Sequence, residues 1–298
     1  MATLSEWVEG ARPRTLPAAT APVMAGTATA WHHLGEMSGR HLLLALLAAV
    51  VALALQVGVT YANDYSDGIR GTDDDRVGPM RLVGSGAAPA RRVKLAAFAC
   101  FGMAAVAGLV IVLLTQAWWL LAVGVASIVA AWFYTGGRNP YGYAGWGEVF
   151  VFIFFGLVAV LGTHYVLTGA VTAAAVVAAV GIGSVACALL VANNLRDIPS
   201  DREVGKRTLA TRLGDGGTRF LFVVLMAVAV LSVVLVAALT TWWALLGLLM
   251  VPTAVLAVQV VRSGAQGRDL VPVLKTTGLT ELRMGLGLLA GIALTHLL

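Results

Sequence analysis

Two clusters of acidic residues lie in an otherwise apolar sequence, and their side chains could hold metal ions. The first cluster occupies residues 63–76 and the second residues 193–207, and each directly follows an apolar run long enough to cross a bilayer. Arginine and lysine residues are interleaved with the acids in both clusters. Oxygen ligands with basic side chains nearby are typical of sites where Mg²⁺ binds a phosphate group. The two clusters together therefore predict that an anionic phosphate group binds at a membrane surface.

The spacing within each cluster places two polar side chains on the same helical face. Asn63 and Asp67 are four residues apart, as are Asp197 and Asp201, so each pair shares a face if the helices continue beyond the membrane core. Two such faces, opposed across a bundle, would present four oxygen-bearing side chains to one cavity. A solvated loop of mixed charge is the simplest alternative. The repetition of the pattern at matched positions favours a site over a solvated loop.

The composition indicates a membrane protein. The chain of 298 residues is 59% hydrophobic and only 12% charged, whereas a soluble domain carries about 25% charged residues. Long continuous apolar runs predict helices, because the strands of a membrane barrel alternate in polarity. We therefore predict an all-α integral membrane protein with nine transmembrane helices in a single bundle, forming one domain over residues 1–298. The predicted spans are residues 16–33, 41–62, 93–114, 117–134, 147–167, 170–192, 218–239, 241–261 and 279–297.

The distribution of basic residues predicts the orientation. If the N-terminus lies inside, 19 of the 20 Lys and Arg residues fall in inner segments, and Arg40 is the exception. The positive-inside rule then places the N-terminus in the cytoplasm and the C-terminus outside the cell membrane. The basic charge is thus a topology signal and gives no indication of nucleic-acid binding. Both acidic clusters fall on the cytoplasmic side, where the connections are long.

A weak internal repeat relates the two clusters. Asn63 and Asn193 occupy equivalent places at the inner ends of the second and sixth predicted spans. An offset of four spans keeps both clusters on the same side of the membrane, as duplication of a four-helix unit would. A parallel four-helix pseudo-repeat is therefore predicted.

Several motifs resemble a known family of membrane enzymes. The acids at Asn63-Asp64-x-x-Asp67, with Asp73, and at Asp197-x-x-x-Asp201 resemble the two aspartate motifs of the UbiA-type intramembrane prenyltransferases. Three further groups of motifs resemble the branch that prenylates 1,4-dihydroxy-2-naphthoate in menaquinone synthesis. They are the segment 11–17 (ARPRTLP), the segments 134–137 and 142–148, and the segment 193–210, which begins NNLRD and ends GKRTLA. The resemblance covers nearly the whole chain.

The resemblance implies a nine-helix fold and a reaction that depends on Mg²⁺. A polyprenyl diphosphate would place its tail among the spans and its diphosphate at the acidic clusters, and an aromatic acceptor would attack the allylic carbon. The implied metal ligands are Asn63, Asp64, Asp67, Asp73, Asp197 and Asp201. The implied partners of the diphosphate are Arg70, Arg138, Arg196, Lys206 and Arg207. The implied residues near the acceptor or the carbocation are Arg12, Tyr65, Tyr134 and Tyr165.

The third acid of the first motif is ambiguous. The general spacing in the superfamily is four residues after Asp67, where this chain has Gly71. The naphthoate branch has a spacing of six residues, which corresponds to Asp73. Asp73, Asp74 and Asp75 therefore remain alternatives as metal ligands.

Three other functions remain as alternatives. A prenyltransferase of the same fold could use 4-hydroxybenzoate, homogentisate or a haem vinyl group as the acceptor. A transporter could use the acids as an ion site, although its charged residues are usually expected near the membrane midplane. A CDP-alcohol phosphotransferase also uses aspartates at the membrane surface, but its D-G-x-x-A-R motif does not continue beyond Asp67-Gly68.

Overall fold

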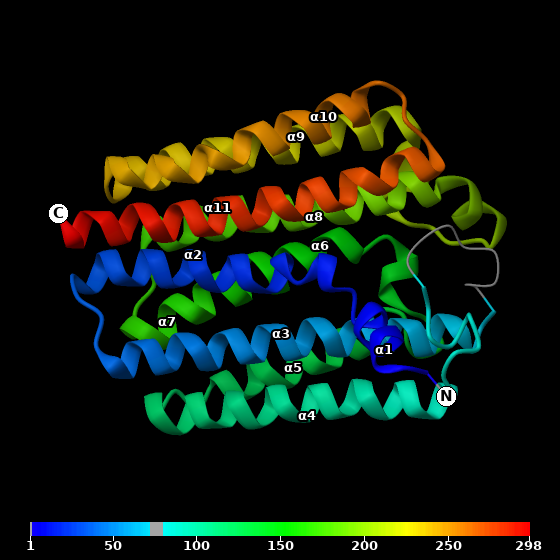
Figure 1. The fold of residues 1–298 in the computed structure, drawn as a ribbon, viewed down its shortest axis with the longest axis horizontal. Coiled ribbons are helices and arrows are strands. Elements are labelled where there is room, and N and C mark those ends of the chain that lie inside the picture. The colour runs from blue at the N-terminus through cyan, green and yellow to red at the C-terminus, as the bar shows by residue number, and fades with distance from the viewer. Residues whose placement is uncertain (1, 72–79) are drawn as a thin grey trace.

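The computed structural model describes residues 2–71 and 80–298, and no strand occurs within them. Long helices lie side by side along one common direction (Figure 1). Seven helical segments are long and apolar enough to cross a membrane. They are α3 (Gly39–Gly68), α4 (Ala90–Thr115), α6–η3–α7 (Gly147–Val151, Phe152–Leu161 and Gly162–Thr168), α8 (Ala173–Glu203), α9 (Leu209–Leu239), η4–α10 (Trp242–Met250 and Val251–Arg262) and η5–α11 (Gly267–Leu270 and Val271–Leu297). These seven overlap seven of the nine predicted spans.

The other two predicted spans correspond to helices that are shorter or less apolar. They are α2 (Pro17–Leu34) and α5 (Leu120–Phe133), and both run beside the long helices (Figure 1). Three short elements complete the described fold: α1 (Leu4–Gly10), η1 (Pro13–Thr15) and η2 (Tyr141–Ala144). The all-helical fold is as predicted for the described residues.

Helices α3 and α8 extend well beyond the apolar runs from which they were predicted. Ser38 forms the N-cap of α3, and no glycine or proline interrupts the helix until Gly58 and then Gly68, so it continues six residues past the predicted limit. Helix α8 begins after the N-cap Thr172 and continues eleven residues past its predicted limit, ending before Gly205, whose φ is 72°. The extension of α3 contains Asp64 and Asp67, and the extension of α8 contains Asp197, Asp201 and Glu203. Because both helices continue beyond the predicted spans, Asn63 and Asp67 share a face of α3, and Asp197 and Asp201 share a face of α8.

A close contact between two glycines allows α8 and η3 to pack tightly in the interior of the bundle. Helix α8 is the most deeply buried of the seven candidate spans, and it packs against α9, α2, α11 and the ten-residue π-helix η3. A Cβ atom added to Gly156 of η3 would lie 2.7 Å from the Cα atom of Gly183 in α8. Small residues allow helix backbones in lipid to approach this closely.

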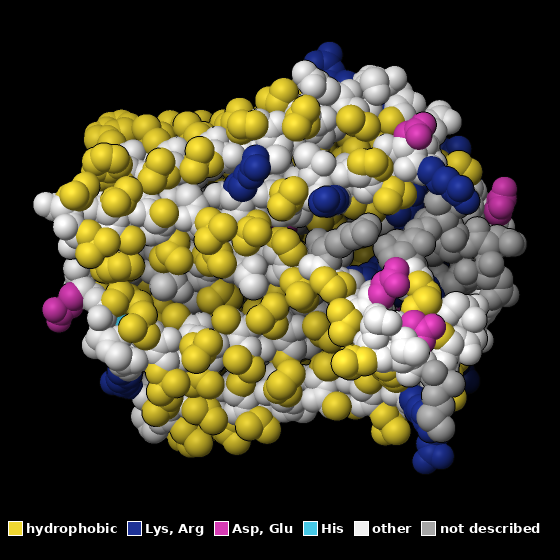
Figure 2. Space-filling view, in the orientation of Figure 1, with side chains coloured by type: hydrophobic (Ala, Val, Ile, Leu, Met, Phe, Trp, Pro, Cys, Tyr) yellow, Lys and Arg dark blue, Asp and Glu magenta, His cyan; other side chains and the backbone are white. Residues whose placement is uncertain are grey.

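The two ends of the bundle and its flanks differ in character. Hydrophobic side chains cover much of the flank in view, whereas charged side chains gather mainly towards one end (Figure 2). That end also carries the N-terminus and the C-terminal ends of α3 and α8, while the C-terminus of the chain lies at the opposite end (Figure 1). Because α3 and α8 finish at the same end, the two acidic clusters can contribute to one site.

Candidate active site

A cavity with a volume of about 1910 Å³ connects the charged end of the bundle to its apolar interior. The polar lining comes from both acidic clusters and from segments near them. It includes Arg12, Asn63, Asp67, Arg81, Tyr143, Asn193, Arg196, Asp197, Asp201 and Lys206. The apolar lining reaches Val112 at the far end of α4 and Leu120 at the start of α5. One continuous space therefore offers a charged mouth and a deep apolar channel.

The first cluster contributes Asn63 and Asp67 from the same face of α3. The Asn63 Oδ1 atom accepts a hydrogen bond of 2.7 Å from the Thr135 hydroxyl. The buried Asp67 carboxylate accepts hydrogen bonds from Arg81 Nη2, at 3.3 Å, and from the hydroxyl of Tyr143. Asp67 is thus held by two residues that come from outside α3.

The second cluster is organised around Arg196. Its guanidinium forms a two-pronged pair with Asp197, with 2.6 Å from Nε to Oδ1 and 2.7 Å from Nη2 to Oδ2. The same Nη2 donates to Asn193 Oδ1 at 2.9 Å. One turn further along α8, Asp201 lies 3.6 Å from the ammonium group of Lys206. Each of the three described aspartates that line the cavity, Asp67, Asp197 and Asp201, therefore has a basic side chain beside it.

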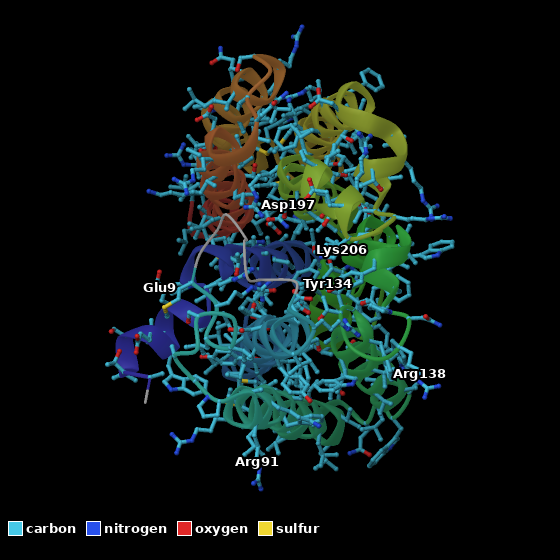
Figure 3. The ribbon with its side chains drawn as sticks, turned by 90° about the vertical axis from the view of Figure 1, so that its right-hand side faces the viewer. Glu9, Arg91, Tyr134, Arg138, Asp197 and Lys206 are labelled. Carbon is cyan, nitrogen blue, oxygen red and sulfur yellow. The ribbon has the colours of Figure 1, made fainter. Side chains whose placement is uncertain are left out.

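Views along the bundle agree with this grouping. Seen from the charged end, Asp197, Lys206 and Tyr134 lie near the centre, whereas Arg138, Arg91 and Glu9 lie at the periphery (Figure 3). Arg138 and Arg207 are exposed and do not line the cavity. Of the basic residues predicted to contact a diphosphate, Arg196 and Lys206 are the ones whose positions suit that role.

Asp64 has a different environment from the one predicted for a metal ligand. Its Oδ2 atom accepts the backbone N–H of Leu82 at 2.7 Å, and its Oδ1 atom accepts that of Val83 at 3.1 Å. The side chain is 1% exposed and is absent from the cavity lining. Because successive residues of an α-helix are about 100° apart around the axis, Asp64 faces the segment that follows the loop. Its carboxylate fastens that segment to α3.

Three more predicted residues lie away from the cavity or point elsewhere, and a fourth is not among the described residues. Tyr65 stacks on Trp132 with ring centroids 6.0 Å apart, and Tyr165 accepts a hydrogen bond of 3.4 Å from Trp119 Nε1 near the opposite end of the bundle. Arg70 donates to the backbone carbonyls of Thr135 and Gly137. None of these three lines the cavity. The fourth, Asp73, lies outside the described residues together with Asp74 and Asp75.

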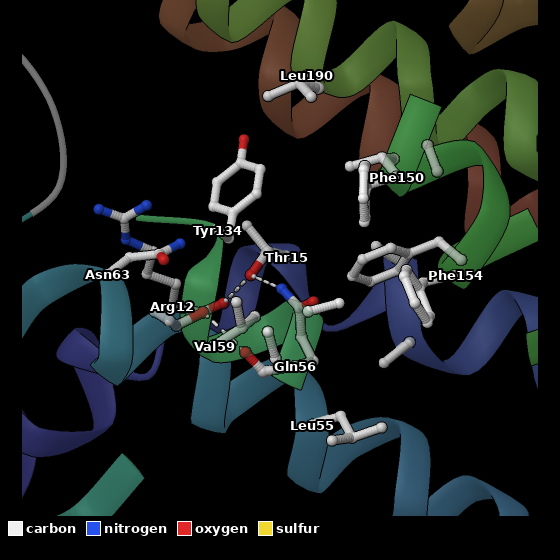
Figure 4. A pocket seen from close by; sticks show the side chains of 18 of the residues that line it. Arg12, Thr15, Leu55, Gln56, Val59, Asn63, Tyr134, Phe150, Phe154 and Leu190 are labelled. Atoms are coloured by element: carbon white, nitrogen blue, oxygen red, sulfur yellow. Dashed lines mark hydrogen bonds between the residues drawn. The ribbon is translucent and has the colours of Figure 1, made fainter. Parts of the chain in front are cut away.

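Arg12 and Tyr134 do line the cavity, and both are among the lining side chains drawn in Figure 4. Arg12 has the left-handed backbone conformation, with φ of 55° and ψ of 67°. Its carbonyl accepts a hydrogen bond of 2.9 Å from Thr15, whose hydroxyl accepts one of 3.0 Å from Gln56 in α3. This chain of hydrogen bonds positions the segment before α2 against α3.

Aromatic rings form one wall of the cavity beyond Tyr134. Tyr141 packs edge-on against Tyr134, with centroids 5.5 Å apart, and stacks on Phe150 at 4.0 Å. Phe154 continues the wall at 6.1 Å from Phe150. The Tyr141 hydroxyl donates to the carbonyl of Ala130 at 2.8 Å, and burial raises the pKa of Tyr141, which keeps it neutral. Neutral aromatic faces of this kind attract a passing cation.

Two polar residues of the site were missed by the sequence-based prediction of its members. Arg81 and Tyr143 both contact Asp67, yet Arg81 follows the first cluster and Tyr143 belongs to neither cluster. The only signal for Tyr143 was its place in the segment 142–148, to which no role could be given. Neither residue lies on α3 or α8 with the acids, so the four-residue spacing within a helix could not identify them.

Comparisons with known proteins show the family to which the chain belongs. The model of the UbiA prenyltransferase family matches residues 19–273, so the chain belongs to that family. The 1,4-dihydroxy-2-naphthoate octaprenyltransferase of Mycobacterium tuberculosis (strain ATCC 25618 / H37Rv) is 54% identical, with 100% of both chains covered. With its seven apolar spans, this member of the family is a multi-pass membrane protein.

Solved structures of distant homologues share the fold. The apo structure of a UbiA homologue from Aeropyrum pernix K1 superposes with a TM-score of 0.69 at 16% identity, covering 99% of each chain. A UbiA homologue from Archaeoglobus fulgidus, bound to DMAPP and Mg²⁺, superposes with a TM-score of 0.64 at 15% identity, covering 97% of this chain and 99% of its own.

Proposed function

We propose that this protein transfers a polyprenyl group from a polyprenyl diphosphate to 1,4-dihydroxy-2-naphthoate, forming the precursor of menaquinone. This proposal rests on one cavity with a volume of about 1910 Å³. In it, paired acidic and basic side chains adjoin an apolar channel. A polyprenyl diphosphate has the same division into a charged head and an apolar tail. The naphthoate acceptor is supported by the relative of 54% identity over the full chain.

The donor set fits Mg²⁺ as the cofactor. Asn63, Asp67, Asp197 and Asp201 all line the cavity and offer only oxygen ligands, which Mg²⁺ prefers. Within residues 2–71 and 80–298, no three His, Cys, Asp or Glu side chains converge closely enough to hold an ion by themselves. This suits an ion that takes its remaining ligands from substrate phosphate and water. The bound ion would supply positive charge to stabilise the departing diphosphate. Asp73 remains a predicted further ligand.

The basic side chains of the cavity have a separate role towards the diphosphate. Arg196 and Lys206 lie beside Asp197 and Asp201, and Arg81 lies beside Asp67. All three can donate hydrogen bonds to phosphate oxygens from these positions, and charge-assisted bonds of this kind are the strong ones. They would therefore hold the diphosphate at the mouth of the cavity and leave the tail to enter the channel.

The aromatic wall would receive the allylic carbon. Breaking the bond between this carbon and the diphosphate oxygen produces a carbocation, and the faces of Tyr134, Tyr141 and Phe150 can stabilise it. The electron-rich naphthoate ring then forms a new C–C bond with the allylic carbon. The ring loses its carboxylate as CO₂, and a separate oxidation gives demethylmenaquinone. Arg12, at the entrance, is placed to contact the acceptor.

We also propose the membrane arrangement predicted from charge. All nine spans, with α2 and α5 included, would cross the cell membrane, and the active site would face the cytoplasm. An alkaline phosphatase domain fused after Leu298 should then be active in cells, whereas the same domain fused before Leu4 should be inactive. The reverse pattern would contradict this orientation.

Prenyl transfer by the purified protein in detergent tests the proposed function. Farnesyl or geranylgeranyl diphosphate would be supplied with Mg²⁺ and either labelled 1,4-dihydroxy-2-naphthoate or labelled 4-hydroxybenzoate. We expect a prenylated naphthoquinone and CO₂ from the first acceptor, and no product with EDTA. Product from 4-hydroxybenzoate alone would move the protein to another branch of the family. Failure to bind diphosphate with metal would return the transporter as the better explanation.

The two-pronged contact of Arg196 gives a sharper prediction. Arg196→Lys keeps the charge but cannot form both hydrogen bonds to Asp197, because an ammonium group lacks the planar fork of a guanidinium. Removing the partner of a metal ligand usually weakens metal affinity 10- to 100-fold. We therefore expect the Mg²⁺ concentration for half-maximal transfer to rise at least about ten-fold.

Arg138→Lys is the matched control, because Arg138 is exposed and outside the cavity. Its Mg²⁺ requirement should equal that of the unsubstituted protein. An equal increase in both variants would show that exchanging an arginine for lysine raises the Mg²⁺ requirement even away from the cavity, and it would remove Arg196 from the site.

A further inference from the structure

Tyr143 contacts both acidic clusters although it belongs to neither. Its hydroxyl donates to Asp67 of the first cluster. Its ring lies under the Lys206 ammonium group of the second, with 4.3 Å from Nζ to the ring centroid, and 5.6 Å from the Cζ atom of Arg70. Its carbonyl accepts the backbone N–H of Arg207 at 2.9 Å. One side chain in the short element η2 thus links α3 to the loop between α8 and α9.

The backbone around Tyr143 is held from both sides. The N–H of Gly142 donates to the Tyr134 carbonyl at 3.0 Å, which fixes the segment to the end of α5. Arg212 of α9 donates to the Ala144 carbonyl at 2.8 Å. A Cβ atom at Gly142 would lie only 2.7 Å from the Tyr134 carbonyl oxygen, so glycine permits this close approach. Tyr143 is therefore placed by contacts that do not depend on its own side chain.

The contacts of Asp67 leave its carboxylate little freedom to rotate. Tyr143 donates to Oδ1 and Arg81 donates to Oδ2. A carboxylate that binds a metal is usually hydrogen-bonded in this manner by neighbouring residues, which set its direction. On the other side of the ring, the attraction between the ammonium group and the π face keeps Lys206 near Asp201.

We propose that Tyr143 is a positioning residue that links the two halves of the diphosphate site: its hydroxyl orients Asp67 towards a divalent cation, and its ring holds Lys206 for the diphosphate. This inference rests on the proposed function, because it assigns the roles of Asp67 and Lys206 within that site. The hydroxyl and the ring of Tyr143 thus have separate roles. One substitution can remove the hydroxyl alone, and another can remove both groups.

Two substitutions at this position separate the contributions. Tyr143→Phe removes the hydroxyl and keeps the ring, whereas Tyr143→Leu removes both. Binding of Mn²⁺, used in place of Mg²⁺, would be measured by electron paramagnetic resonance in the presence of farnesyl thiodiphosphate, a slowly reacting analogue. The Michaelis constant for farnesyl diphosphate would be measured separately. Tyr61→Phe is the matched control, because the Tyr61 hydroxyl donates to the backbone carbonyl of Trp7 at 2.9 Å and Tyr61 does not line the cavity.

For Tyr143→Phe we expect the dissociation constant of Mn²⁺ to rise about ten-fold, while the Michaelis constant for the diphosphate changes less than about two-fold because the ring still holds Lys206. Tyr143→Leu should show the same loss of Mn²⁺ affinity and a Michaelis constant raised about five-fold. Lys206→Met should raise the Michaelis constant and leave Mn²⁺ binding unchanged. Tyr61→Phe should change neither quantity.

Two results would overturn the proposal. Mn²⁺ binding by Tyr143→Phe equal to that of the unsubstituted protein would show that the hydroxyl does not orient Asp67. Weaker Mn²⁺ binding and a raised Michaelis constant in Tyr61→Phe as well would show that loss of any tyrosine hydroxyl disturbs the protein in general. If Tyr143→Leu does not fold, the Mn²⁺ affinity of Tyr143→Phe still decides whether the proposal stands. An unsubstituted protein that neither binds Mn²⁺ with the analogue nor transfers a prenyl group would contradict the proposed function itself.

Discussion

Replacing Asp67 with asparagine is expected to lower prenyl transfer at least about a thousand-fold, which corresponds to about 4 kcal/mol in the activation free energy. Asp67 lines the cavity, and its carboxylate is held by Arg81 and Tyr143. Asparagine has nearly the same shape but lacks the negative charge that a hard divalent cation requires. The expected change is therefore in turnover and metal binding, while the fold is retained. The measurement is the initial rate with saturating substrates over a range of Mg²⁺ concentrations.

Asp64→Asn is the control because Asp64 is close in sequence and different in contacts. Its two oxygens each accept a backbone N–H, from Leu82 and Val83, and an amide side chain can accept through only one atom. Leaving a buried donor unsatisfied costs about 1–3 kcal/mol, so we expect a lower unfolding temperature and nearly normal turnover in the protein that remains folded. Normal stability with no turnover in Asp64→Asn would reverse the two assignments and make Asp64 a metal ligand.

The second large effect is expected from Gly291→Val in α11. Gly287 and Gly291 are four residues apart and pack against the backbone of η4. A Cβ atom at Gly291 would lie 2.2 Å from the carbonyl oxygen of Trp243, and one at Gly287 would lie 2.3 Å from that of Leu246. No side-chain movement relieves an overlap with backbone, so η4 would have to separate from α11. Overpacking typically destabilises by 1–3 kcal/mol and occasionally more, and we expect about 3 kcal/mol or more here.

Gly102→Val in α4 provides the comparison. Nothing lies within 4 Å of a Cβ atom at Gly102, and this residue is exposed on the outer side of the bundle. Valine should be tolerated there, with an unfolding temperature within a few degrees of the unsubstituted protein. Thermal unfolding in detergent, followed by the loss of the monodisperse peak in size-exclusion chromatography, compares the two variants. Equal destabilisation by both would mean that valine itself is unfavourable, and the packing of α11 on η4 would not be the cause.

Apolar runs were sufficient to predict most of the helices, because few other structures can cross a bilayer. They were not sufficient to predict where α3 and α8 end. Those helices continue into polar sequence because the polar side chains face an internal cavity and find partners there, as Asn63 does with Thr135 and Arg196 with Asp197. The spacing of four residues correctly placed each acidic pair on one face. This prediction succeeded because the four-residue spacing depends on the geometry of one helix and on no neighbouring element.

The failures occurred where a prediction required knowledge of neighbouring elements. Tyr65 lies two residues before Asp67, and two residues turn the helix by about 200°, so its ring packs on Trp132 outside the cavity. Tyr165 was chosen for its chemistry, but its helix places it near the opposite end of the bundle. Tyr143 reaches Asp67 from η2, and Arg81 reaches it from the segment that precedes α4. No local pattern specifies which loop folds back onto a site.

The left-handed backbone of Arg12 places stability and activity in opposition at one position. Only glycine adopts this conformation easily, and for other residues it costs about 1–2 kcal/mol. The chain nevertheless has an arginine there, with φ of 55° and its side chain at the entrance of the cavity. A search for more thermostable variants would consequently tend to select glycine at position 12, which would remove the guanidinium that we propose contacts the acceptor. Engineering of this enzyme for heat resistance should hold that residue constant.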